Sequence, residues 1–161
     1  MLTRTHISLR LLLVAVLAIA TLSCGTTRKA LNMETNAEFM LVADPDINPS
    51  TDGKASPIVL QVVKLRDDRQ FKQEDFLNLF EDAKARLGND LIEITKLREL
   101  APGEKRTEKL ALSPDVKFIG ILGEYVQYND ADAKTVIKIE PHTTTKATLK
   151  IEKLKVYFHQ E

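Results

Sequence analysis

Five oxygen-bearing side chains alternate with other residues in the stretch 44–52, which is the spacing of a calcium-binding loop. They are Asp44, Asp46, Asn48, Ser50 and Asp52. A loop of this type needs glycine at its sixth position for a sharp turn and a bidentate glutamate at its twelfth. Those positions hold Pro49 and Ala55. The pattern therefore predicts a series of turns, in which Asp and Asn bond to their own backbone, and no metal site.

Side chains for enzyme chemistry are sparse in the remainder of the sequence. His142 and His159 have neither a cysteine nor a pattern of paired carboxylates around them. No serine lies in a nucleophile elbow, and no glycine-rich phosphate loop is present. We therefore predict that the protein is not an enzyme, has no catalytic residues and binds no cofactor apart from a covalent lipid.

The lipid is predicted from Cys24, the single cysteine of the chain, and from the residues before it. Arg4 and Arg10 precede the apolar run 11–20, and small Ser23 stands directly before Cys24. A basic start, a short apolar run and a small residue at the cut are typical of a secretory signal peptide. With cysteine next, the pattern is similar to a bacterial lipobox, although Thr21 stands where leucine is preferred. We expect residues 1–23 to be removed and Cys24 to be acylated, and the alternative is ordinary cleavage that leaves Cys24 as a free thiol.

The composition of the remaining chain limits its partners. Removal of residues 1–23 leaves 161 − 23 = 138 residues with a formal charge of 21 − 23 = −2. Such a balance does not favour nucleic acid, and the length suits one domain with one sizeable core. With one cysteine no intramolecular disulfide is possible. The second mature position holds Gly25 and not aspartate, and this feature is similar to that of lipoproteins that are forwarded to the outer membrane.

The polar composition of residues 24–36 predicts a tether, and hydrophobic periodicity predicts a mainly β domain at 37–161. Short strands are expected at 38–43, 58–65, 91–100, 105–112, 116–128, 135–139, 144–151 and 154–158. Between the second and third strands the period changes to that of a helix, with one face formed by Phe76, Leu79, Phe80, Ala83 and Leu87. The pattern is compatible with one helix or with two short ones. We expect a two-sheet antiparallel sandwich with a short helical insertion. The apolar face of the helix should point to the core. Gly120 and Gly123 should allow close approach of another segment to the backbone, or a bulge.

An ordered set of motifs resembles the TssJ family of type VI secretion lipoproteins. The motifs are Cys24, the stretch 43–49, the strand 57–65, Phe71, Asp75 with Phe76, and the stretches 87–90, 100–104 and 112–115. The resemblance implies a transthyretin-like or immunoglobulin-like sandwich, held by its lipid in the inner leaflet of the outer membrane and facing the periplasm. It also implies binding to the periplasmic C-terminal region of TssM, and through TssM to TssL.

The long loop between the first two strands is the predicted partner-binding site, because ordered loops on a rigid sandwich are common binding surfaces. Our candidate residues are Asp44, Asp46, Ile47, Asn48 and Asp52, with Ile47 as an apolar anchor in a polar rim. Alternatively, Ile47 packs back onto the domain. A second functional hypothesis is a periplasmic lipoprotein that captures a soluble ligand, or inhibits an enzyme, through the same loop.

Overall fold

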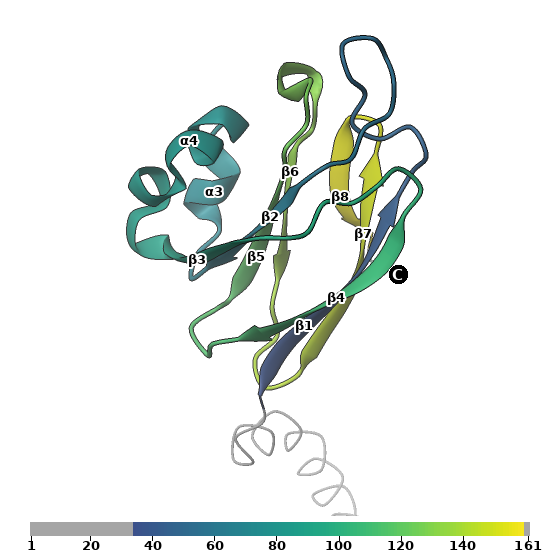
Figure 1. The fold of residues 1–161 in the computed structure, drawn as a ribbon. Coiled ribbons are helices and arrows are strands. Elements are labelled where there is room, and N and C mark those ends of the chain that lie inside the picture. The colour runs from purple at the N-terminus through teal and green to yellow at the C-terminus, as the bar shows by residue number, and fades with distance from the viewer. Residues whose placement is uncertain (1–33, 160–161) are drawn as a thin grey trace, which may run out of the picture. The chain divides into compact units, whose positions relative to one another are not determined.

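The computed structural model describes residues 34–159 and shows two four-stranded sheets that face each other (Figure 1). The first sheet has the strand order β4-β1-β7-β8, and the second has the order β3-β2-β5-β6. The strands are β1 (Thr35–Ala43), β2 (Leu60–Leu65), β3 (Leu91–Lys96), β4 (Lys105–Leu112), β5 (Phe118–Gly123), β6 (Lys134–Lys138), β7 (Thr144–Glu152) and β8 (Lys155–His159). The helical insertion is α3 (Arg69–Gln73), α4 (Phe76–Leu87) and the 3-10 turn η1 (Gly88–Asp90), and a second 3-10 turn, η2, spans Tyr128–Asp130.

The predicted mainly β sandwich with a helical insertion is therefore confirmed. Five of the six strand ladders are antiparallel, whereas β1 and β7 pair in parallel with Phe39 opposite Ala147. The parallel ladder joins the first strand of the domain to the seventh, so no local turn signal in the sequence marks it.

The core lies between the sheets and follows the alternation of the strands. In β1, Ala37, Phe39 and Leu41 are buried, while Met40 between them is exposed. Their partners in the core include Leu60, Val62, Ile119, Ile121, Leu149 and Ile151. Each large apolar side chain of this kind stabilises the fold by about 1.5–3 kcal/mol when fully buried, so the two sheets are held together mainly by this layer.

A second apolar layer explains why β2 is apolar on both faces. Val63 and Leu65 on β2 and Leu122 on β5 pack against Phe71 and Leu79 of the helices. The two helices thus cover the outer face of the second sheet (Figure 1). Because β2 lies between β3 and β5, the prediction that it is a central strand is confirmed.

Gly120 on β5 is a point of close approach between the sheet and α3. A Cβ atom at Gly120 would lie 2.6 Å from Cζ of Phe71, which is far inside van der Waals contact. The Phe71 ring is itself almost fully buried. The predicted close approach at this glycine is confirmed, and the second predicted glycine, Gly123, approaches the ring of Tyr125.

The helix α4 is broken at Asp82, so the alternative of two short helices holds. Asp82 has φ −150° and ψ 68°, and its Oδ1 accepts a hydrogen bond from the Ala85 N–H at 3.0 Å. Asp82 therefore caps the second short helical segment in the manner of an N-cap residue. Leu79, Ala83 and Leu87 are buried as expected, but Phe80 is 43% exposed, so its assignment to the core is wrong.

Several strand ends also differ from the predictions. The expected strand 116–128 ends at Gly123, because the chain turns there through a hydrogen bond from Tyr125 N–H to Gly123 O at 2.9 Å. The predicted third strand, 91–100, ends at Lys96. Thr35 and Asn36, which we assigned to the tether, lie in β1. The rest of the predicted tether and the signal peptide fall outside the described residues.

Candidate partner-binding surface

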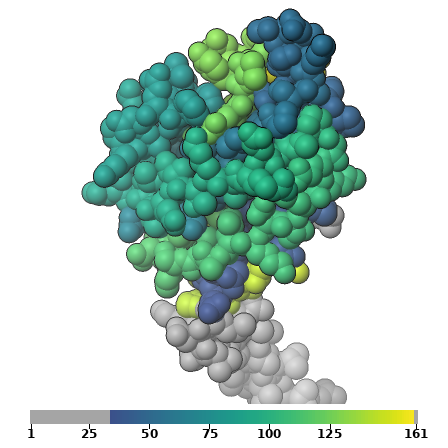
Figure 2. Space-filling model, in the orientation of Figure 1, coloured from purple at the N-terminus to yellow at the C-terminus, as the bar shows by residue number. Residues whose placement is uncertain are grey.

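The loop 44–57 follows β1 and is fastened to two neighbouring turns by backbone hydrogen bonds. Asp44 N–H donates to Ile151 O near the end of β7 at 2.9 Å, and Asn48 N–H donates to Lys153 O in the β7–β8 turn at 3.0 Å, so this hairpin holds the start of the loop. Gly103 N–H, from the turn before β4, donates to Asp44 O at 3.1 Å. In Figure 2 the loop lies beside the β5–β6 connection at one end of the domain.

Ile47 lies in the hydrophobic core and has no exposed surface. Its predicted role as the apolar anchor of the contact is therefore wrong for this conformation of the loop, and the alternative that it packs back onto the domain holds. The reason is that the loop passes over the end of the sandwich, where an isoleucine side chain gains more by joining the core than by facing water. Ile47 fixes the loop in place.

Asn48 is also buried, at 3% exposure, and joins three segments of the chain. Its Nδ2 donates to Pro57 O at 2.7 Å, and its Oδ1 accepts from Val126 N–H at 2.7 Å. Its φ of 44° lies in the left-handed region, which asparagine tolerates better than most residues. Asn48 is therefore a positioning residue for the loop, because its polar atoms are directed inward.

Three acidic residues of the loop keep their predicted place at the surface. Asp46 and Asp52 are exposed and Asp44 is partly exposed. Among the described residues none of the three has an ion-pair partner. These carboxylates are thus available to a partner with basic side chains.

Sequence reasoning missed the β5–β6 connection, which lines the same end of the domain. Gln127 Nε2 donates to Pro49 O and to Ser50 O, both at 3.0 Å. Val126 and Tyr128 on either side of it are exposed. The sequence marks this segment only as the end of an apolar strand, because the contacts that bring it to the loop span more than 70 positions.

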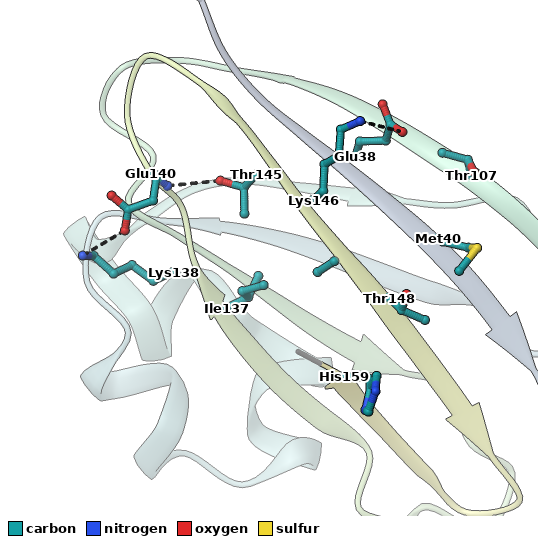
Figure 3. Close-up of a pocket in the computed structure, with 11 residues that line it drawn as sticks. Glu38, Met40, Thr107, Ile137, Lys138, Glu140, Thr145, Lys146, Thr148 and His159 are labelled. Carbon is teal, nitrogen blue, oxygen red and sulfur yellow. Dashed lines mark hydrogen bonds and ion pairs between the residues drawn. The ribbon is translucent and has the colours of Figure 1, made fainter. Parts of the chain in front are cut away.

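A groove of about 730 Å³ lies along the first sheet (Figure 3). Its charged residues are paired within the groove. Lys146 Nζ lies 3.9 Å from Glu38 Oε1, and Lys138 Nζ lies 3.2 Å from Glu140 Oε1. Since these side chains neutralise one another, the groove presents no converging set of charges to a ligand. Within residues 34–159 no group of three or more His, Cys, Asp or Glu side chains is placed to hold a metal ion.

Cys24, the predicted lipidation site, falls outside the described residues. No helix among residues 34–159 is both long enough and apolar enough to cross a membrane.

Comparison with known proteins places this geometry in context. A family model described as "Type VI secretion lipoprotein, VasD, EvfM, TssJ" matches residues 35–154. The T6SS lipoprotein TssJ1 from Pseudomonas aeruginosa has a crystal structure that is similar to this chain, with a TM-score of 0.73 and 26% identity, covering 80% of this chain and 97% of that one. No curated protein matches the sequence significantly.

Two further solved structures share the fold. Serratia marcescens Lip, described as a membrane bound component of the Type VI Secretion System, has a TM-score of 0.70 and 21% identity, covering 78% of this chain and 98% of that chain. A chain of the structure described as "T6SS protein TssM C-terminal domain (869-1107) from EAEC" has a TM-score of 0.66 and 20% identity, covering 79% of this chain and 99% of that chain.

Proposed function

The chain belongs to the type VI secretion lipoprotein family that includes VasD, EvfM and TssJ, and from this premise we propose that it is a non-enzymatic, lipid-anchored scaffold of the type VI secretion membrane complex. Its lipid on Cys24 anchors it in the inner leaflet of the outer membrane. Its domain faces the periplasm and binds the periplasmic C-terminal region of TssM, and through TssM it is linked to TssL. Two or three acyl chains, at about 0.8 kcal/mol per buried CH₂, make such an anchor stable.

The course of β1 supports this arrangement. The chain enters the described domain at Thr35, next to the anchored segment in sequence, and β1 then runs to Ala43 before the loop begins. At about 3.3 Å per residue a strand of this length spans roughly 26 Å. The loop 44–57 therefore lies at the end of the domain opposite to the point where the anchored segment joins it, and it is available to a partner that reaches across the periplasm.

The observation that carries the proposal is the set of unpaired carboxylates on an ordered loop at that end. Asp44, Asp46 and Asp52 have no basic partner in residues 34–159. Close charge pairs across an interface raise the association rate and select the partner. Membership of the type VI secretion lipoprotein family supports a partner within the type VI secretion membrane complex, and we take TssM as that partner.

The test is capture of TssM from detergent-solubilised envelopes, with charge-reversed variants of the lipoprotein. We expect wild type to capture TssM and Asp46→Lys/Asp52→Lys to lose it. The matched control is Asp115→Lys/Glu140→Lys, which changes the charge equally at the other end of the domain, where both carboxylates are exposed. Equal capture of TssM by both double variants would show that the loop is not part of the interface. No capture by wild type would overturn the scaffold proposal and favour a lipoprotein that takes up a soluble ligand.

A further inference from the structure

An aromatic surface lies next to the loop 44–57. Five large apolar side chains are exposed in residues 34–159, and four of them, Leu77, Phe80, Val126 and Tyr128, lie on α4 or directly after β5. Phe80 stacks on Phe76 with ring centroids 5.8 Å apart, and Phe76 meets Tyr128 at 6.0 Å. We call Phe76, Phe80 and Tyr128 the aromatic shelf.

The aromatic shelf and the loop form one continuous surface. Tyr128 follows Gln127, whose side chain donates to two carbonyls of the loop, Pro49 O and Ser50 O. The preceding residue, Val126, donates its N–H to Asn48 Oδ1. Figure 2 shows the β5–β6 connection beside the loop at this end of the molecule. A partner that contacts the loop is therefore within reach of the shelf.

Phe80 lies on the outer side of the first turns of α4. Leu79 beside it is buried against the sheet, and because adjacent residues of a helix point about 100° apart, Phe80 remains 43% exposed. Lys96 Nζ lies 5.9 Å from the centroid of the Phe80 ring and is held by Glu124 Oε1 at 2.9 Å. That ammonium group is already paired, so the shelf itself is suited to an apolar group and not to a further cation.

The charges around the shelf indicate the chemistry of the rest of the contact. Asp46, Asp52 and Asp130 are exposed, and the described residues supply none of them with an ion-pair partner. A surface that combines exposed aromatic rings with unpaired carboxylates is complementary to a segment that carries an apolar side chain beside basic ones.

We propose that the TssM segment that binds the loop also places an apolar side chain on the aromatic shelf and basic side chains against Asp46, Asp52 and Asp130. This inference rests on the proposed function and adds the helical insertion to the interface. It assigns the apolar anchor, which the sequence placed on buried Ile47, to Phe80 and Tyr128. Aromatic side chains that a partner covers at an interface commonly carry much of its binding energy.

The test measures the dissociation constant of the purified, detergent-solubilised lipoprotein for the purified periplasmic region of TssM from the same bacterium. We expect Phe80→Ser and Tyr128→Ser each to weaken binding by about thirtyfold, which is the lower limit for an interface hot spot. The matched control is Met40→Ser, because Met40 is 46% exposed but lies on β1 of the first sheet, whereas the helices cover the second. Met40→Ser should bind as wild type does.

The outcomes separate this inference from the proposed function. If Phe80→Ser and Tyr128→Ser bind like wild type while Asp46→Lys/Asp52→Lys loses binding, the shelf is outside the interface and the scaffold proposal stands. If wild type does not bind TssM, both fail. Circular dichroism and thermal unfolding of each variant verify that a loss of affinity is not a loss of fold. Should Phe80→Ser unfold, Phe80→Gln replaces it, since glutamine keeps a long side chain and favours helix but removes the apolar ring, and wild-type affinity for that variant would overturn the inference.

Discussion

Replacing Asn48 with alanine tests whether one buried amide holds the loop 44–57 in place. The side chain of Asn48 bonds to Pro57 O at the end of the loop and to Val126 N–H in the β5–β6 connection, both at 2.7 Å. Alanine removes both bonds and leaves both backbone groups without this partner. It also places a residue that lacks a polar side chain at φ 44°.

The expected loss of stability follows from these three effects. Each lost hydrogen bond leaves a partly buried backbone group unpaired and lowers the free energy of unfolding by about 1 kcal/mol. This value is the lower end of the usual range for such a loss, because water reaches the flanking residues. The left-handed backbone adds about 1 kcal/mol for alanine. The sum is about 3 kcal/mol, which corresponds to a fall of roughly 12 °C in Tm for a domain of this size.

Urea unfolding of wild type, Asn48→Ala and Asn129→Ala measures this effect. Asn129 is an exposed asparagine in the adjoining turn η2, so the same chemical change there should alter the free energy of unfolding by less than about 0.5 kcal/mol. If Asn48→Ala is no less stable than Asn129→Ala, the amide does not hold the loop, and the view of Asn48 as a positioning residue is refuted.

Three further predictions concern the sheet, the acid stability and the anchor. Gly120→Ala should destabilise the domain by about 3 kcal/mol in urea unfolding, because its Cβ would meet Phe71 at 2.6 Å, and adding Phe71→Leu should recover part of the loss. Hydrogen bonds from Ala101 N–H and from Arg106 and Arg98 lower the pKa of Glu104 from 4.5 to about 2. Because the pKa of Glu104 is lower in the folded than in the unfolded state, its stabilisation is present above about pH 4.5 and is lost as the pH falls toward 2. The Tm difference between wild type and Glu104→Gln should therefore shrink over that interval. A constant Tm difference would contradict this prediction. Cys24→Ala should remove the acyl mass from the mass spectrum and should remove the protein from the outer-membrane fraction, while the purified variant still binds TssM. Retained acylation or lost binding would refute the separation of anchor and binding surface.

The burial pattern of single elements could be predicted from the sequence because it depends on local periodicity. The strand Lys105–Leu112 has the predicted bounds, and β2 is central as expected, since its apolar residues must be covered on both faces. Gly120 was expected to mark a close approach, and the sequence lacks only the identity of the approaching ring, Phe71. The sequence does not decide whether α4 is continuous, because Asp82 is compatible with a continuous helix as well as with a cap.

The binding surface combines features that follow from the order of the residues with features that need the folded chain. The strand and helix periodicity, the loop with its carboxylates and the resemblance to a lipoprotein family follow from residue types and their order. The inward direction of Ile47 and Asn48 and the exposure of Phe80 and Tyr128 become evident only in the folded chain. The exposure of a side chain depends on which distant segments cover it. Here those segments are the β7–β8 turn and the β5–β6 connection, which lie far from the loop in sequence and contact it only in the folded chain.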